Sequence, residues 1–207
     1  MKTFKTGKNF KMGFYCVIED DVEIGDDVKI GHFVTLKNGT RIGNRVIMAD
    51  YCCTTGMCYI GNDVNIRTHS TISKGLIIED RVFIGGGVLS SSKGTIIENK
   101  NPINEKSSTY AGHVNPITRM QQLITRVGMG SLIGSSCNLA AGVIVGSNVI
   151  VGYASNICKN LIEPGIYYGN PAQKVRSIPI DMIMDPPDGW EPHEFPSEMV
   201  KKYLGSA

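Results

Sequence analysis

The residues of this chain that could carry out acid–base chemistry are its four histidines and the carboxylates near them. Two of the histidines, His32 and His69, flank Asp50. A neutral imidazole accepts a proton readily near pH 7, and a neighbouring carboxylate can orient the ring. This set suits a reaction in which an amine or a hydroxyl loses a proton as it attacks a carbonyl group. The three residues can act together only if the fold brings them side by side.

Composition predicts one globular domain. Of the 207 residues, 42% are hydrophobic and 19% are charged, and the formal net charge is +2. These values are ordinary for a folded chain and argue against extended disorder. Lys and Arg form no stripe that could follow a phosphate backbone, so nucleic acid is not an expected partner.

The chain shows no sign of secretion or of membrane insertion. Its basic N-terminus is not followed by an apolar segment, so we expect no secretory signal and a cytoplasmic location. The most apolar stretch, residues 132–158, is interrupted throughout by Gly, Ser and Asn, which a hydrocarbon environment would penalise. We therefore expect no association with a membrane.

A repeat of six residues dominates the sequence and predicts its fold. An aliphatic side chain usually opens each hexad, at Ile18, Ile24, Ile30, Leu36, Ile42, Met48, Thr54, Ile60, Ile66, Ile72, Ile78, Ile84 and Ser90. A helix needs a spacing of 3.6 and a hairpin meander a spacing of two, so neither fits. A triangular coil of three hexads fits. The first and fifth positions point inward, and the second favours Gly because the corners need positive φ or close backbone approach.

This period predicts an all-β fold, a left-handed parallel β-helix of hexapeptide repeats. The pattern breaks after Thr95 and resumes one residue out of phase at Val127, so we expect a loop insertion at about 96–126. We assign residues 1–175 to the β-helix domain. Residues 176–207 form a C-terminal tail, which is expected to cap the coil end and to include a short helix over 197–204.

The six cysteines have no Cys-x-x-Cys pair and no Cys/His metal spacing. Cys52, Cys58 and Cys137 fall at the fifth, inward-pointing position, where small buried side chains are expected. We therefore expect reduced thiols and no metal.

The coil turns sequence distance into spatial neighbours, because residues eighteen apart stack in columns about 4.8 Å apart. His32, Asp50 and Thr68 share a third-position column, and Phe33, Tyr51 and His69 share the adjacent fourth-position column. Two histidines and a carboxylate are thereby expected at one corner. We expect His69 to act as the general base or proton relay, Asp50 to orient or charge the site, and backbone N–H groups to hold the oxyanion.

The repeats end in Gly169-Asn-Pro-Ala172 followed by the basic residues Lys174 and Arg176. In this the chain resembles the hexapeptide-repeat acyltransferases. It is most similar to nucleotide-sugar N-acetyltransferases that act on 3-amino-3,6-dideoxyhexoses and related UDP- or dTDP-linked amino sugars. Three segments carry the likeness: His32-Phe-Val34, the stretch 75–85, and Asn99-Lys-Asn-Pro102. Where those enzymes have a Gln-Asn-Asn type segment at the sugar, this chain has Arg67-Thr68-His69.

The resemblance implies acetyl-CoA as co-substrate, a nucleotide amino sugar as acceptor and a homotrimer with sites between subunits. For acyl transfer, His32 is also expected to act as a catalytic or substrate-binding residue. Substrate contacts are expected from Arg67, Thr68, Tyr51 and His113, the last from a loop that reaches a neighbouring subunit. CoA contacts are expected from small residues and cations of the later coils: Ala141, Gly142, Ala154, Ser155, Lys159, Lys174 and Arg176.

Other interpretations remain open. Some relatives use no side-chain base, and the departing thiolate takes the proton. An O-acetyltransferase acting on a sugar or antibiotic hydroxyl would also need a histidine. A γ-class carbonic anhydrase shares the fold but needs three histidines on Zn²⁺, and His32, His69 and His113 do not have that spacing. A non-catalytic β-helix within a larger assembly would bind no acetyl-CoA.

Overall fold

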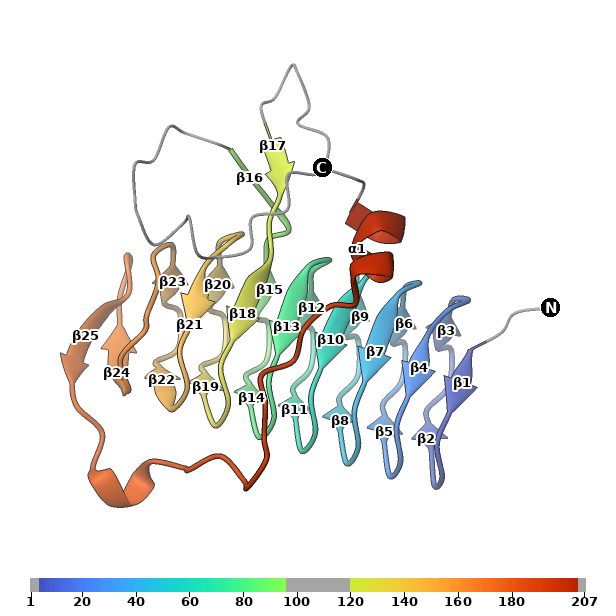
Figure 1. Cartoon of the computed structure of the whole chain (residues 1–207), viewed down its shortest axis with the longest axis horizontal. Helices are drawn as coiled ribbons and strands as arrows, with labels where there is room; N and C mark the ends of the chain where they lie inside the picture. Colours follow the sequence, from blue (N-terminus) through green and yellow to red (C-terminus); the bar gives the residue numbers. More distant parts are fainter. Residues whose placement is uncertain (1–3, 96–119, 205–207) are drawn as a thin grey trace.

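The computed structural model describes residues 4–95 and 120–204 and shows a parallel β-helix of about seven turns (Figure 1). This confirms the predicted left-handed β-helix of hexapeptide repeats. Three parallel sheets form the sides of a triangular prism. We call them sheets A, B and C, and name the corners between them AB, BC and CA.

Most strands are two or three residues long, as expected of hexads that alternate strand and corner. Sheet A contains β1 (Lys5–Thr6), β4 (Glu23–Ile24), β7 (Thr40–Ile42), β10 (Cys58–Ile60), β13 (Leu76–Ile78), β18 (Thr125–Val127) and β21 (Ile144–Val145). Sheet B contains β2 (Lys11–Met12), β5 (Lys29–Ile30), β8 (Ile47–Met48), β11 (Asn65–Ile66), β14 (Phe83–Ile84), β19 (Leu132–Ile133), β22 (Val149–Val151), β24 (Gly165–Tyr168) and β25 (Gln173–Arg176). Sheet C contains β3 (Val17–Ile18), β6 (Thr35–Leu36), β9 (Cys53–Thr54), β12 (Thr71–Ile72), β15 (Leu89–Ser90), β20 (Asn138–Leu139) and β23 (Asn156–Ile157).

The strand register explains the change of phase seen in the sequence. Ile60 pairs with Ile78, eighteen residues on, and Ile78 in turn pairs with Val127. The first hexad position is therefore kept across the insertion, which leaves and re-enters at the CA corner. At its base, β16 (Lys93–Thr95) pairs antiparallel with β17 (Met120–Gln122). The repeat also begins two hexads earlier than the aliphatic pattern indicated, because β1 and β2 place Thr6 and Met12 at first positions.

The core is the interior of the prism, filled by first- and fifth-position side chains. Burying a Val or Ile side chain contributes about 1.5–3 kcal/mol, so each coil adds several such contributions. Cys52, Cys58 and Cys137 lie in this core as predicted, each no more than 1% exposed. Burial raises the pKa of the Cys58 thiol to about 12, so that thiol stays protonated and unreactive at neutral pH.

At the corners, residues at the second and fourth hexad positions have different roles. Fourth-position residues adopt the left-handed conformation, including Phe33 (φ 56°), Tyr51 (φ 59°) and His69 (φ 60°). Second-position glycines instead allow close packing of coils, because a Cβ at Gly31 would lie 2.7 Å from the Asp50 nitrogen. Of the two reasons expected for glycine there, close approach is right and positive φ is wrong.

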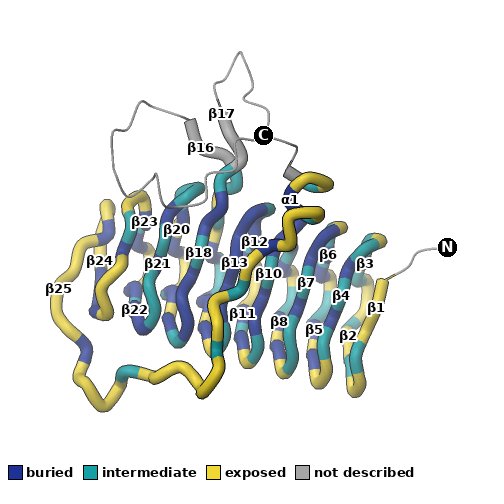
Figure 2. The backbone as a smooth tube through the Cα atoms, in the orientation of Figure 1, coloured by how far each residue is buried: buried dark blue, intermediate teal, exposed yellow. Residues whose placement is uncertain are grey.

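The C-terminal tail does more than cap the last coil. After β25, which pairs antiparallel with β24, the chain passes a short 3₁₀ helix (Ile180–Met182) and returns across the outside of sheet A to α1 (Ser197–Leu204) (Figures 1 and 2). The predicted short helix is confirmed. Phe195, just before this helix, and Val200, within it, pack on the coils. With Met57, Ile77 and Ile124 they form a second buried cluster outside the prism.

Polar contacts fasten this tail strap, residues 177–204, to the coils. The Trp190 indole N–H donates to Asp80 (3.2 Å), and a His193 ring nitrogen lies 2.9 Å from the same carboxylate. Further along, Lys202 and Tyr203 both bond to Asp21 at the corner between β3 and β4. Within the described residues, no helix is long and apolar enough to cross a membrane.

Candidate active site

A ladder of aromatic rings follows the fourth-position column of the BC corner. Tyr15, Phe33, Tyr51 and His69 stack on successive coils, with centroid separations of 5.2, 5.0 and 4.8 Å and interplanar angles of 3–15°. Stacking of such pairs contributes about 0.5–1.5 kcal/mol each, which helps to offset the left-handed backbone. His69 is the last ring of the ladder and is exposed. Neither of its ring nitrogens has a hydrogen-bond partner among the described residues.

The neighbouring third-position column forms a chain of hydrogen bonds. The His32 N–H donates to Asp50 Oδ1 (2.7 Å), and the Phe14 N–H donates to His32 Nδ1 (2.9 Å). The AB corner repeats the pattern, with backbone N–H groups donating to the side chains of Asp26, Asn44, Asn62 and Asp80 at 2.6–2.9 Å. Third-position side chains are therefore acceptors for the preceding coil. Asp50 fills this structural role and touches the His32 backbone, not the His69 ring.

Both columns stop at the same coil, where Gly86 and Gly87 occupy the third and fourth positions. We call these two residues the glycine gap. Without a side chain at Gly86, the N–H of Thr68 has no acceptor among the described residues. Gly87 places no ring over the free face of His69, and among the described residues a Cβ added at Gly87 would meet only Ser136 Oγ within 4 Å. An unpaired donor and an uncovered imidazole thus lie beside one opening on the surface.

The predicted substrate residues lie around this gap. Arg67, Thr68 and His69 are consecutive and all exposed, and the Arg67 Cβ lies 3.9 Å from the position of a Cβ at Gly86. The structure records no carboxylate paired with Arg67 in the described part of the chain. Tyr51 lies directly beneath His69. His113 lies outside the described residues.

The bond from Phe14 constrains what His32 can do. Because Nδ1 accepts a hydrogen bond, the proton of the neutral ring is carried on Nε2. His32 therefore presents a donor to its surroundings in the neutral state, whereas both ring nitrogens of His69 are without a partner in the described segments.

The predicted CoA residues are divided between two corners. Ala154 continues the fourth-position column of the BC corner beyond Gly87 and Ser136, while Ala141, Gly142 and Lys159 lie at the CA corner. Ser155 is buried and accepts a bond from the Gly169 N–H (3.1 Å), and Lys174 is paired with Glu163 (2.8 Å). Arg176 ends β25 and is exposed. One chain thus brings only the BC-corner residues near His69.

Sequence reasoning missed the glycine gap and the partners of the tail. The run Gly85-Gly86-Gly87 was a usable signal, because it removes the third- and fourth-position side chains of one coil. His193 of the tail packs its ring against that of Tyr59, with a centroid separation of 4.1 Å. Burial raises the pKa of the adjacent Glu79 despite its bonds to His193 and Arg126.

The described residues contain no cluster of His, Cys, Asp and Glu suited to a metal.

Residues 21–56 match the family model described as bacterial transferase hexapeptide (six repeats). The matched segment includes His32 and Asp50, and it agrees with the predicted hexapeptide repeat. A search of curated protein sequences finds no match.

Solved structures are similar to this chain at low sequence identity. UDP-N-acetylglucosamine acyltransferase from Campylobacter jejuni has a TM-score of 0.56 at 14% identity, over 83% of this chain and 69% of that chain. A mutant of AntD, an N-acyltransferase from Bacillus cereus, in complex with dTDP and coenzyme A, has a TM-score of 0.47 at 16% identity, covering 86% of both chains. The acetyltransferase domain of PglB from Neisseria gonorrhoeae, in complex with acetyl coenzyme A, has a TM-score of 0.41 at 17% identity, over 83% of this chain. This chain spans 54% of that Neisseria chain.

Proposed function

We propose that this chain, a hexapeptide-repeat transferase, moves an acyl group from a coenzyme A thioester to the amino group of a nucleotide-linked amino sugar. The observation that supports the proposal is the glycine gap, where the exposed imidazole of His69 adjoins the Thr68 N–H and, in the part of the chain that the structure describes, neither group has a hydrogen-bond partner. Acyl transfer needs both groups, a proton acceptor for the attacking amine and a donor for the oxyanion.

His69 is the proposed proton acceptor. As the neutral amine attacks the thioester carbonyl, a C–N bond forms and the carbonyl oxygen becomes negative. The imidazole takes the proton from nitrogen. Collapse of the tetrahedral intermediate then breaks the C–S bond and releases the coenzyme thiolate, which recovers a proton from the imidazolium. Tyr51 supports the imidazole from below, and Asp50 contributes through the backbone of the corner.

The Thr68 N–H is the proposed oxyanion donor. The bond from His32 N–H to Asp50 Oδ1 shows where such a corner N–H finds its acceptor, and at Thr68 that place is empty because Gly86 has no side chain. A substrate oxygen there would make the bond that a third-position side chain makes elsewhere. Removing one donor of this kind typically costs about 10²- to 10³-fold in kcat.

The donor thioester is proposed to approach along the small residues beyond the gap. Gly87, Ser136 and Ala154 form a column without bulky side chains at the BC corner. Ala141, Gly142 and Lys159 lie at the CA corner and are proposed to meet the same ligand from another copy, in a site built between subunits. Acetyl-CoA is the proposed donor, and Arg67 is placed to meet phosphate groups of the acceptor.

A homotrimer is part of the same proposal, and the outer face of the later coils of sheet B is the suggested contact. Phe83 and Leu132 project from it and are each 37% exposed. Asn65, between Ile47 and Phe83 in the same column, has an Oδ1 that is covered but without a hydrogen-bond partner in the described part of the chain. Light scattering after size-exclusion chromatography measures the oligomeric state directly.

The test of the function is release of free thiol from acetyl-CoA in the presence of UDP- and dTDP-linked amino sugars. Wild-type protein is expected to turn over at least one of them, and His69→Ala is expected to lower kcat by about 10²-fold or more. Unchanged turnover in this variant contradicts the base assignment. If none of the UDP- and dTDP-linked amino sugars supports thiol release, the proposed class of acceptor is contradicted.

O-acetylation of a hydroxyl is the second candidate, because a hydroxyl acceptor also needs a base and His69 has both nitrogens free. The same assay with sugars that carry a hydroxyl in place of the amine separates the two reactions.

A further inference from the structure

Charged residues on the outside of this helix follow a rule set by its eighteen-residue coil. Residues i and i+18 lie opposite each other on neighbouring coils, and where both are charged they have opposite signs. On sheet A the column runs Lys5, Glu23, Arg41, and at the AB corner it runs Asp27, Arg45, Asp63, Arg81. The pairs make direct contacts, at 3.0 Å for Lys5–Glu23, 2.6 Å for Lys37–Glu19 and 2.6 Å for Arg45–Asp63.

Lys11 and Lys29 break this rule. They are register partners on β2 and β5 in sheet B, so the two side chains leave the sheet about one strand spacing apart, roughly 4.8 Å. Both are exposed, and the structure records no carboxylate paired with either among the described residues. Like charges directly opposite one another repel and destabilise a sheet. No other pair of like charges stands at this spacing in the described coils.

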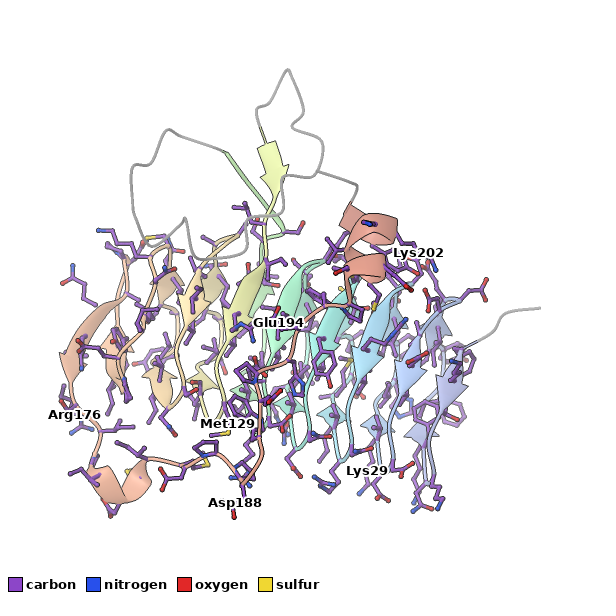
Figure 3. The ribbon with its side chains drawn as sticks, in the orientation of Figure 1. Lys29, Met129, Arg176, Asp188, Glu194 and Lys202 are labelled. Atoms are coloured by element: carbon purple, nitrogen blue, oxygen red, sulfur yellow. The ribbon has the colours of Figure 1, made fainter. Side chains whose placement is uncertain are left out.

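A surface cavity of about 420 Å³ lies over these two lysines, lined by Asn9, Lys11, Asp27, Lys29, Arg45 and Ile47. Three of the lining residues are cationic and one is anionic. The Asp27 carboxylate accepts from the Asn9 amide (2.9 Å) and Arg45 pairs with Asp63, so among the described residues Lys11 and Lys29 are the two lining cations without a direct carboxylate contact. Figure 3 labels Lys29 on the lower edge of the helix, away from the tail strap.

We propose that Lys11 and Lys29 bind the phosphate groups of an anionic ligand in this cavity. A phosphate oxygen can lie between two ammonium groups at this spacing, so a phosphate or diphosphate supplies the negative charge that Glu or Asp supplies in the other columns. The Arg45 guanidinium, whose Nε and Nη2 bond to Asp63, adds positive charge at the edge of the site. The site lies on the first coils, so it is separate from the glycine gap and does not depend on the proposed acyl transfer.

The test is the melting temperature of the full chain, followed at low ionic strength with increasing pyrophosphate. Wild-type protein is expected to be stabilised, and Lys29→Gln to bind at least tenfold more weakly. Lys29→Glu recreates the alternating column with Lys11, so it is expected to melt higher than wild type without ligand and to lose the response. Lys37→Gln removes a lysine that is paired with Glu19 and is the matched control.

Uridine diphosphate and adenosine 3′,5′-bisphosphate distinguish the sources of phosphate. Tighter binding of one nucleotide than of pyrophosphate assigns the site to that class of nucleotide, and equal binding assigns it to the phosphate group alone. Absence of stabilisation by all three compounds in the millimolar range overturns the proposal. An equal loss in Lys37→Gln and Lys29→Gln also overturns it, because binding would then follow net charge.

Discussion

The Gly86→Asp variant tests whether the glycine gap is where the reaction occurs. Gly86 does not have a positive φ, and a Cβ there would meet the Thr68 carbonyl oxygen at 3.3 Å, so a side chain fits with a small adjustment. An aspartate is expected to accept from the Thr68 N–H as Asp50 does from His32 (2.7 Å). The variant thus supplies from the protein the group that the substrate is proposed to supply.

The expected effects have opposite signs for stability and activity. The new hydrogen bond contributes about 0.5–1.5 kcal/mol, and loss of a glycine from the unfolded chain adds about 0.4–1 kcal/mol. The close Cβ contact offsets part of these contributions. We therefore expect the free energy of unfolding to rise by about 1 kcal/mol, or Tm to rise by about 2–4 °C for a chain of this size. Activity is expected to fall by about 10²-fold, as for loss of an oxyanion donor.

Thermal unfolding and the thiol-release assay together decide the outcome. Gly86→Ala adds the Cβ without an acceptor and is the control for steric effects, and Gly86→Asn adds an acceptor without charge. A more stable Gly86→Asp protein with full activity would show that the Thr68 N–H plays no part in the reaction. A variant without any gain in stability would show that this N–H does not point into the gap.

Three further perturbations follow from the fold. Tyr51→Leu removes the ring beneath His69 and is expected to lower kcat about two- to tenfold, the equivalent of 0.5–1.5 kcal/mol of stacking, while Tyr51→Phe retains kcat in the same assay. Gly31→Ala puts a methyl group 2.7 Å from a nitrogen of the next coil and is expected to lower the free energy of unfolding by more than 2 kcal/mol in urea titrations. Burial raises the pKa of Asp80, but its hydrogen bonds outweigh this and hold the pKa below the usual value. The contribution of this carboxylate to stability is therefore complete above about pH 3.9 and is lost as the pH falls below that value. Fluorescence of Trp190, the single tryptophan, is expected to report release of the tail strap only under those acid conditions.

The repeat predicted the fold and its columns because a period of six leaves few backbone solutions. Phe33, Tyr51 and His69 were placed in one column from numbering alone, and the structure stacks their rings. What Asp50 does could not be read in this way. Its carboxylate satisfies a backbone N–H of the preceding coil, a demand that arises only once the corner is folded. The hydrogen bond from the His32 N–H is thus a role of Asp50 that its place between two histidines in the sequence did not reveal.

The course of the tail was also beyond the sequence. Residues 177–196 carry no periodic pattern, and their path depends on contacts with coils far away in the chain, such as that of Trp190 with Asp80. Only the helix that follows had a local signal. The glycine gap was in the sequence but had no meaning until the neighbouring coils showed which side chains were missing.

The strap changes how this solenoid unfolds. A stack of repeats ordinarily has only nearest-neighbour interfaces, so its ends fray independently and partly melted forms are populated. Here Lys202 and Tyr203 hold Asp21 near the opposite end, closing a loop over most of the chain. The early coils cannot detach without releasing the last helix, which makes melting more cooperative. During synthesis, the early coils reach full stability only after the final residues have been made and have packed on them. This contact is expected to form slowly, because it joins residues far apart in the chain.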